Sequence, residues 1–377
     1  MKQIFYTAHL FDGNEFRQDQ LIEVEDGEII SVSHGQAEQA QCTLDGLLVP
    51  GFIDIQVNGG GGVLFNNHPT LASLVTISQA HQAFGTTNML PTLITDGYTT
   101  MLAAANAMAQ AIETGLSGVC GIHFEGPHLS QPKKGIHPQN HIRSITDQEL
   151  ALFTRQDIGK VIVTLAPENV TPDVIRDLVQ QGVVVCLGHS NADAATVEAA
   201  LHAGATGFTH LYNAMSPLTG REAGMVGTAL LDESAYCGLI VDHHHVSMAS
   251  CKLAIKCKGA DKMMLVTDAM SHVGSNQQSE TFSGMEITRD GDKLTIAGGT
   301  LAGSALDMAS AVRNTHRDLQ VPLAQSLRMA AATPARFLAL DKRYGYIKPG
   351  YRADWVSLSD NLSVNQTWID GKAVYCA

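Results

Sequence analysis

Basic residues are scarce in this chain of 377 residues, which has 24 Lys and Arg against 37 Asp and Glu and a net charge of −13. Proteins that bind nucleic acids or membrane surfaces present basic patches, so this balance argues against both kinds of partner. A small anionic substrate needs only two or three local donors and is not excluded. Hydrophobic residues make up 45% and charged residues 16%, which is typical of a globular protein with a large core.

Cysteine pairs and long apolar segments are also absent. The seven cysteines are odd in number and include no CxxC pair, so no disulfide framework is expected and a reducing compartment is favoured. The start, MKQIFYTAHLFDGNEF, has no apolar signal core, and no apolar stretch approaches the ~20 residues of a membrane-spanning helix. We therefore expect a cytoplasmic protein.

Both ends of the chain predict short strands joined by turns. Asp-Gly turn signals occur at positions 12, 26 and 45, and a further one at position 370. We expect residues 1–49 and 345–377 to form one small β-sandwich domain from both termini, leaving residues 50–344 for a separate domain.

The middle of the chain contains eight short apolar runs, separated by segments that mostly have the pattern of amphipathic helices. DVIRDLVQQG and ATVEAALHAG are the clearest of these, and each ends at a glycine suited to a helix C-terminus. Eight buried strands alternating with helices predict the α/β class and a (β/α)8 TIM-type barrel. A doubly wound sheet is the alternative, but it rarely needs eight such units. The runs cover residues 51–59, 85–94, 118–126, 160–168, 182–190, 207–214, 236–245 and 262–270.

The segment after the eighth run, ETFSGMEITRDGDKLTIAGGTLAG, predicts a hairpin inserted in the last barrel loop. Helices over about 305–318 and 323–340 would complete the barrel.

Polar side chains stand at the ends of these runs, where barrels of this type carry their active sites. Burying so many polar groups without a purpose would be costly. They are Gln56, Asn58, Glu125, Glu168, His189, His210, Asn213, Asp242, His245 and Asp268.

Four of these side chains suit a catalytic metal site. Glu125, His189 and His210 offer the N/O ligands that zinc or a similar divalent ion prefers, and three protein ligands plus a water are typical of a catalytic site. Asp268 follows the last strand, where it could take a proton from that water. Each residue alone has an ordinary explanation, as a core histidine, a loop glutamate or a capping aspartate. All four at one end of the barrel make that explanation much weaker.

The motifs around these residues resemble a known family. HFEGPHL, KKGIHP, TLAPE, LGHSNA, THLYNAMSPLTGREAGMVG, VDHHHV, LVTDAM and GTLAGSALDM occur in order along nearly the whole chain. Together with LLVPGFIDIQVNGGGG and GYIKPGYRADWVSL, they are similar to the N-acetylglucosamine-6-phosphate deacetylases of the amidohydrolase superfamily.

The resemblance implies that Glu125, His189 and His210 hold one divalent metal ion per subunit, preferably Zn²⁺. It implies that Asp268 acts as general base and then as general acid. His137 would position or polarise the acetyl carbonyl.

The resemblance also implies a binding site for an amino-sugar phosphate. Asn213, Ala214, Arg221 and His245 would hold the sugar phosphate, and Ala302 would contact it through the backbone. Members of the family form homodimers, so a neighbouring subunit could lend phosphate donors such as Arg221.

One departure from the wider superfamily concerns the first strand. Many amidohydrolases have His-x-His there and bind two metals, whereas this chain has Gln56-Val57-Asn58. Gln56 could bond to a metal-bound water or approach the ion weakly. We expect one tightly held metal, and a second, looser ion is left open.

The expected reaction is hydrolysis of N-acetyl-D-glucosamine 6-phosphate to D-glucosamine 6-phosphate and acetate by a metal-activated water. Two alternatives stay open. Relatives acting on N-acetyl-D-galactosamine 6-phosphate share most of these motifs, and a sugar-phosphate-binding protein without catalysis would use the same barrel.

Overall fold

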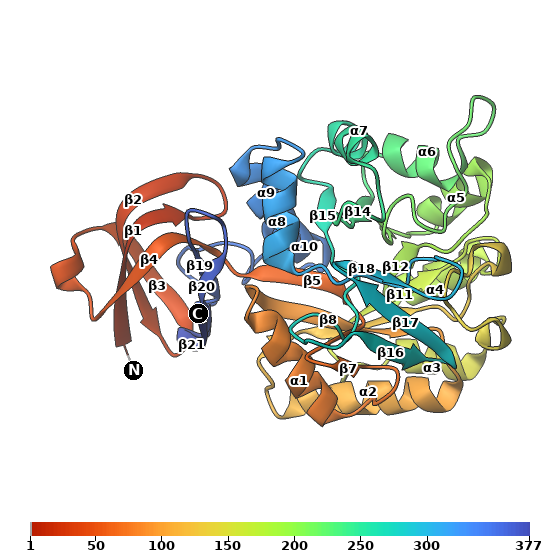
Figure 1. Cartoon of the computed structure of the whole chain (residues 1–377), viewed down its shortest axis with the longest axis horizontal. Coiled ribbons are helices and arrows are strands. Elements are labelled where there is room, and N and C mark those ends of the chain that lie inside the picture. The colour runs from red at the N-terminus through yellow and green to blue at the C-terminus, as the bar shows by residue number, and fades with distance from the viewer. Residues whose placement is uncertain (1) are drawn as a thin grey trace.

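Eight parallel strands form the centre of the larger part of the molecule, which Figure 1 shows on the right. The structure is a computed structural model that describes residues 2–377. Each strand pairs with the next along the chain, and the eight apolar runs of the sequence supply them in order. The strands are β5 (Phe52–Val57), β8 (Thr86–Ile94), β10 (Gly121–Glu125), β11 (Lys160–Leu165), β12 (Val184–Leu187), β13 (Gly207–Phe208), β14 (Tyr236–Leu239) and β15 (Met263–Leu265).

Every residue of β5, β8 and β10 is buried, as expected for parallel strands covered on both faces. The first and last strands meet just beyond their ends. There Asp268 donates its N–H to the Gln56 carbonyl at 2.9 Å, and Asn58 donates its N–H to the Ala269 carbonyl at 2.8 Å. The closure of the barrel therefore fixes the backbone of two candidate site segments against each other.

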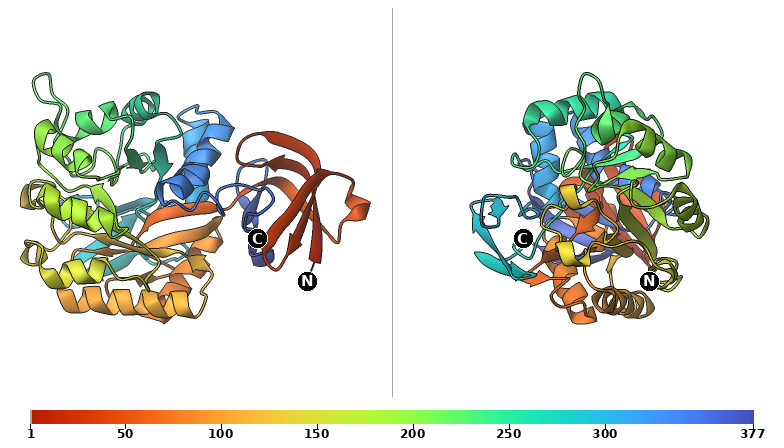
Figure 2. Two further views of the ribbon diagram at one scale, coloured as in Figure 1. Left: turned by 180° about the vertical axis from the view of Figure 1, so that it is seen from behind. Right: turned by 90° about the vertical axis from the view of Figure 1, so that its right-hand side faces the viewer.

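Helices surround the strands, as the right-hand view of Figure 2 shows. Both helices singled out in the sequence form and are followed by glycines with positive φ, Gly182 and Gly204. No helix within residues 2–377 combines the length and apolarity needed to cross a membrane. The helices are α1 (Leu71–Gln82), α2 (Tyr98–Glu113), α3 (Asp147–Phe153), α4 (Pro172–Gln180), α5 (Ala194–His202), α6 (Gly224–Leu231), α7 (Met248–Lys258), α8 (Met308–Arg317), α9 (Leu323–Ala330) and α10 (Ala332–Phe337).

The prediction of one continuous helix over 323–340 was wrong. The chain breaks into α9 and α10 at Ala331, whose φ of −132° and ψ of −74° are not helical. Pro334 has no N–H to donate to the carbonyl four residues earlier, so a continuous helix would lose a hydrogen bond there.

The insertion after β15 has three strands where the sequence predicted a hairpin: β16 (Ser279–Phe282), β17 (Met285–Asp290) and β18 (Lys293–Thr295). Phe282, Ile287 and Leu294 of this sheet pack in one cluster with Met270 and Ala302. The cluster holds the insertion against the loops at the carboxyl end of the barrel. Three further short strands are β6 (Gly59–Gly60), β7 (Val63–Leu64) and β9 (Gly118–Val119).

Both chain ends contribute to the small β domain on the left of Figure 1. Its seven strands form one hydrogen-bonded sheet in the order β21-β20-β19-β4-β1-β2-β3. Ile29 of the edge strand β3 exchanges backbone hydrogen bonds with Gly350 and Tyr351, so the sheet folds around a core that contains Phe5 and Trp355. The prediction of a barrel with a small β domain from both termini is confirmed. The strands are β1 (Lys2–Phe11), β2 (Phe16–Glu25), β3 (Glu28–His34), β4 (Cys42–Pro50), β19 (Trp355–Leu358), β20 (Val364–Ile369) and β21 (Lys372–Cys376).

Candidate active site

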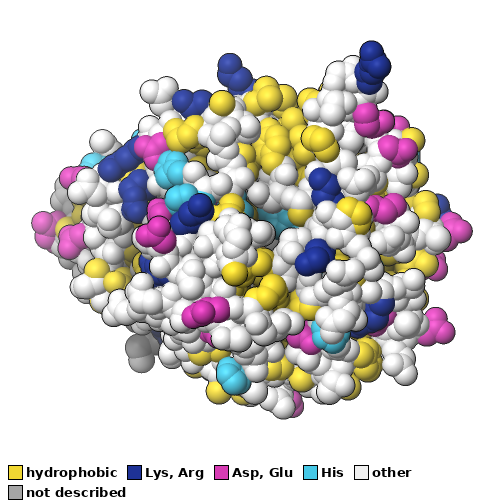
Figure 3. Space-filling model, turned by 45° about the vertical axis from the view of Figure 1, so that its right-hand side comes forward, with side chains coloured by type: hydrophobic (Ala, Val, Ile, Leu, Met, Phe, Trp, Pro, Cys, Tyr) yellow, Lys and Arg dark blue, Asp and Glu magenta, His cyan; other side chains and the backbone are white. Residues whose placement is uncertain are grey.

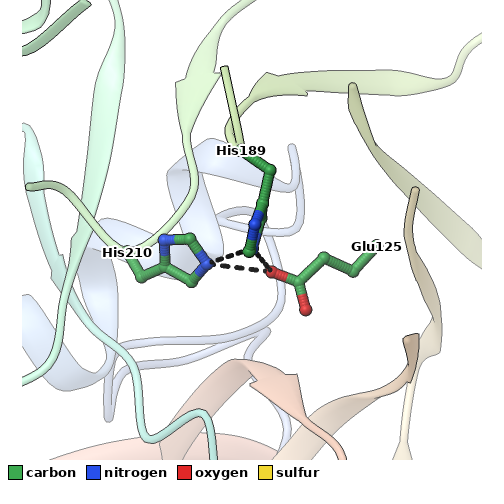
Figure 4. A group of neighbouring side chains, drawn as sticks. All are labelled: Glu125, His189 and His210. Atoms are coloured by element: carbon green, nitrogen blue, oxygen red, sulfur yellow. Dashed lines mark hydrogen bonds and ion pairs between the residues drawn. The ribbon is translucent and has the colours of Figure 1, made fainter. Parts of the chain in front are cut away.

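Three side chains from three neighbouring strands converge at the carboxyl end of the barrel. Glu125 is the last residue of β10, and His189 and His210 stand two positions after β12 and β13. All three are buried, with exposed fractions of 2%, 6% and 4%. Figure 4 shows the two imidazole rings and the carboxylate pointing toward one another.

The distances among these three groups fit a single cation. His189 Nε2 lies 2.9 Å from His210 Nε2, and Glu125 Oε1 lies 3.2 Å and 3.0 Å from these two nitrogens. Two ligand atoms ~2.1 Å from a tetrahedral ion are ~3.4 Å apart. The observed separations are close to this value, and the three residues form a group able to hold a metal ion.

Hydrogen bonding behind the site supports the same interpretation. His189 Nδ1 lies 2.8 Å from the Lys133 carbonyl oxygen, which can only accept, so the neutral ring carries its proton on Nδ1. Its Nε2 then presents a lone pair toward His210 and the Glu125 carboxylate. Lone pairs that converge in this way are stabilised by a cation between them, and a carbonyl behind a ligand histidine is typical of metal sites.

Local backbone conformation aims these side chains. His189, His210 and Asp268 have φ values of 48°, 32° and 53°, in the left-handed region that ordinary residues rarely adopt. Such residues cost free energy and cluster at functional sites. The strand ends turn sharply here, which directs the side chains into the barrel mouth.

Asp268 lies beside the three ligands and has an environment suited to proton transfer. Its Oδ1 accepts hydrogen bonds from Asn58 Nδ2 at 2.6 Å and from Gln56 Nε2 at 3.2 Å. Burial and the nearby Glu125 carboxylate raise the pKa of Asp268 to about 6, although the bond from Asn58 opposes the rise. A carboxylate with this pKa can take up and release a proton near neutral pH.

Gln56 links the base to the ligands. Its Nε2 also donates to Glu125 Oε1 at 3.2 Å, so one amide group bridges the two carboxylates. A donor between two acidic side chains reduces their repulsion.

His137 faces the same site from the loop after β10. Its ring lies against the His189 ring, with centroids 4.2 Å apart, and its Nε2 lies 3.9 Å from Glu125 Oε2. The Thr95 hydroxyl is 2.8 Å from His137 Nδ1 and 3.1 Å from the Glu125 carbonyl. The Glu125 carbonyl can only accept, so the single Thr95 hydroxyl proton is donated to it and His137 Nδ1–H donates to the Thr95 oxygen. The neutral ring then turns an unprotonated Nε2 toward the cavity.

A cavity of about 230 Å³ opens above these groups. Figure 3 shows histidine side chains inside a hollow on this face of the molecule. Asn213, Ala214 and His245 line the cavity, as do Asn58 and the predicted catalytic and ligand residues Glu125, His137, His189, His210 and Asp268.

Two predicted substrate residues are not among the residues that line this cavity. Ala302 is fully buried, while its neighbours Leu301 and Gly303 line the wall. Arg221 is exposed in the loop before α6. A Cβ on Gly303 would lie 2.6 Å from Met270 and 2.9 Å from the Asp268 carbonyl oxygen, so this close approach to the Asp268 loop requires glycine.

His245 is oriented by Asp242. Its Nδ1 donates to Asp242 Oδ2 at 2.6 Å. Burial opposes ionisation of Asp242, but the bonds from His245 and from two backbone N–H groups lower its pKa to about 2. The segment is a turn around Asp242, so strand alternation does not decide which histidine faces the cavity. His243 and His244 instead lie beside Asp318 and Asp292.

Several supporting residues received no role from the sequence. Thr95 directly follows β8, and a search for polar residues at all strand ends would have found it. Glu168 accepts hydrogen bonds from Ser190 Oγ at 2.6 Å and from the Asn191 N–H at 2.8 Å, which fixes the loop that carries His189. His123 bonds to the Ile55 carbonyl and to Thr164 Oγ1, so it is a satisfied core histidine.

The fold and the site together define a metal-dependent hydrolase of the (β/α)8 barrel type. The model of the amidohydrolase family matches residues 47–374, so the chain belongs to the amidohydrolase family. The predicted family and the predicted class of enzyme, a hydrolase that cleaves amide carbon–nitrogen bonds, are both confirmed.

Curated relatives and solved structures cover almost the whole chain. An N-acetylgalactosamine-6-phosphate deacetylase from Shewanella sp. (strain ANA-3) is 50% identical over 94% of this chain and 92% of its own length. An N-acetylglucosamine-6-phosphate deacetylase from Haemophilus influenzae is 37% identical over 92% of each chain. The crystal structure of N-acetylglucosamine-6-phosphate deacetylase from Pasteurella multocida superposes with a TM-score of 0.96, covers 100% of both chains and is 33% identical.

Proposed function

We propose that the chain hydrolyses N-acetyl-D-glucosamine 6-phosphate to D-glucosamine 6-phosphate and acetate. The observation that carries this proposal is the convergence of Glu125, His189 and His210 beside Asp268 in one cavity. The cavity of about 230 Å³ is smaller than the ~300–1,000 Å³ typical of drug-sized ligands and suits a single sugar.

Glu125, His189 and His210 would hold one divalent ion per subunit. Two imidazole nitrogens and one carboxylate oxygen favour Zn²⁺. A bound ion of this kind polarises a carbonyl and lowers the pKa of water toward about 7.

Asp268 would move the protons of the reaction. It takes a proton from the attacking water as the water oxygen bonds to the acetyl carbon. It then gives that proton to the sugar nitrogen as the carbon–nitrogen bond breaks. One carboxylate therefore serves both steps, and its pKa of about 6 suits both directions of transfer.

His137 would position the acetyl carbonyl of the substrate. Its Nδ1 donates to Thr95 Oγ1, which in turn donates to the Glu125 carbonyl, and this holds Nε2 on the side of the Glu125 carboxylate. A ring fixed in advance can orient the carbonyl without reorganisation.

Binding of the sugar phosphate would fall to the cavity wall. Asn213, Ala214 and His245 line the cavity, and Ala302 would contribute through its backbone neighbours. Arg221 suits a phosphate because its planar fork donates two hydrogen bonds at once. Since Arg221 is exposed outside this cavity, we propose that it serves the site of a neighbouring subunit in a homodimer.

The remaining assignments concern the chain as a whole. We propose that residues 1–49 and 345–377 act as one domain and residues 50–344 as the catalytic domain. The seven cysteines are all free thiols, which supports a cytoplasmic location.

N-acetyl-D-galactosamine 6-phosphate is the second candidate substrate. The 50% identity to the Shewanella deacetylase of that epimer favours it, against 37% for the Haemophilus relative. The two sugars differ only at C4, so the proposed proton transfers are the same for both.

Acetate release from the two 6-phosphate epimers and from unphosphorylated N-acetylglucosamine tests this proposal. Faster turnover of the gluco epimer with little on the free sugar is the expected result. Preference for the galacto epimer would keep the chemistry and change the substrate. No acetate from any of the three, despite bound metal, would refute the proposed function.

A further inference from the structure

Asn58 stands at the end of the first barrel strand and touches the proposed base directly. Its side chain is 1% exposed and lines the cavity. The bond from its Nδ2 to Asp268 Oδ1 is 2.6 Å long, against 3.2 Å for the bond from Gln56 to the same oxygen. Two amide donors therefore occupy Oδ1.

The other oxygen of Asp268 has no such partner. Within residues 2–377, no hydrogen bond from a side chain or backbone group reaches Oδ2. An oxygen that accepts two hydrogen bonds is a poorer base than one that accepts none. The arrangement therefore makes Oδ2 the oxygen that exchanges a proton with water and substrate.

The orientation of the Asn58 amide group is fixed, because its NH₂ must face the Asp268 carboxylate. The carbonyl oxygen Oδ1 is then a buried acceptor with no protein partner, in a residue that lines the cavity. Buried acceptors are normally paired, so this oxygen calls for a donor that enters with the substrate.

We propose that Asn58 is a further catalytic residue, whose Nδ2 leaves Asp268 Oδ2 as the only basic oxygen and whose Oδ1 accepts the N–H of the scissile acetamide. The inference rests on the proposed function, because only an amide substrate brings that N–H to the site.

The order in which bonds form and break in the reaction gives Asn58 its role. A water proton goes to Asp268 Oδ2 as the water oxygen bonds to the acetyl carbon, and the carbonyl π electrons move to the carbonyl oxygen. The carbonyl then re-forms, the electrons of the carbon–nitrogen bond move to nitrogen, and nitrogen takes the proton from Oδ2. Holding the N–H at Asn58 turns the nitrogen lone pair toward that proton.

The experiment compares two variants and two substrates. Asn58→Leu keeps the approximate size of the side chain and removes both polar atoms, while Asn58→Ala removes the side chain beyond Cβ. Ser271→Ala is the matched control, since it deletes a fully buried hydroxyl that has no partner. The substrates are the preferred N-acetyl sugar phosphate and its 2-O-acetyl ester, which has no N–H. Metal content, kcat and KM are measured for each protein.

We expect both Asn58 variants to keep one metal per chain and a KM within about 3-fold, with kcat on the amide lower by about 100-fold. The loss of kcat on the ester should be about 10-fold or less. The ester offers no N–H, and its leaving oxygen needs a proton less than the leaving nitrogen of the amide does. The control should match the unmodified protein on both substrates.

Three results would overturn the inference. They are an unchanged kcat on the amide, equal losses on amide and ester, and loss of metal from both variants, which would mean that Asn58 serves the ligands and not the proton transfer. Failure of the proposed function is seen separately, as absence of acetate release by the unmodified protein.

Discussion

Replacing Asp268 by Asn changes one atom and separates proton transfer from the rest of the site. The amide can still accept from Asn58 and Gln56 through its oxygen, and none of the three ligand atoms bonds to Asp268. The fold and the metal should therefore be retained. An amide can neither take the water proton nor deliver it to the sugar nitrogen.

The size of the effect follows from the double duty of this carboxylate. A positioned acid or base contributes ~10²–10⁴-fold to a rate. Because Asp268 would serve in both steps, we expect a loss of kcat near 10⁴-fold, which is ~5.4 kcal/mol at 1.36 kcal/mol per tenfold.

Stability should change in the opposite direction. A buried acid whose pKa is raised from 3.8 to about 6 binds its proton more tightly in the folded state. Stability from this group is present at low pH and is lost as the pH rises from about 4 through 6. Near pH 7 the ionised group destabilises the metal-free fold by on the order of 3 kcal/mol, and Asn removes that cost. The metal-free variant should melt at a higher temperature than the unmodified protein.

The assay measures acetate release, metal content and the melting temperature of the metal-free protein. Asp45→Asn is the control, because it makes the same chemical change at an exposed position of β4 in the small domain. Retention of near-full activity in Asp268→Asn, with metal bound, would remove Asp268 from its role.

Three further predictions follow from neighbouring groups. His189→Ala should lose its metal, as measured by elemental analysis, and full metal content would break the ligand assignment. The value of kcat/KM should fall about tenfold per pH unit below about pH 6, because Asp268 must be ionised to accept a proton; a rate that stays flat down to pH 4.5 would contradict this base. Thr95→Val removes the hydroxyl that lies 2.8 Å from His137 Nδ1, so kcat should fall about 10-fold with metal retained. An unchanged kcat in Thr95→Val would show that the bond from His137 Nδ1 to Thr95 does not orient the His137 ring for catalysis.

The barrel could be predicted because its strands are short, apolar and separated by helical segments. Polar residues at the run ends then marked the site, since parallel strands place all their carboxyl ends at one rim. Glu125, His189, His210 and Asp268 can be identified in this way from the sequence alone.

The parts that the sequence did not predict depend on contacts between distant segments or on short local features. The partner of Asn58 is Asp268, 210 positions away, and the pairing exists only because the first and last strands close the barrel. The break at Ala331 follows from Pro334, which cannot donate an N–H to the carbonyl four residues earlier. The third strand of the insertion is only three residues long, Lys293–Thr295, too short for a clear alternation.

Arg221 illustrates a different limit. Motif resemblance gives it a phosphate-binding role, yet it is exposed and is not among the residues that line the cavity of its own chain. A role for such a residue depends on the assembly, which neither hydrophobic pattern nor local propensity describes.

Titration of the metal-free protein with Zn²⁺, with acetate release followed at each step, tests the central claim most directly. If Glu125, His189 and His210 form one catalytic metal site, activity is absent without metal, rises in proportion to the added ion and levels off at one equivalent per chain. Full activity in protein shown to contain no metal would contradict the account.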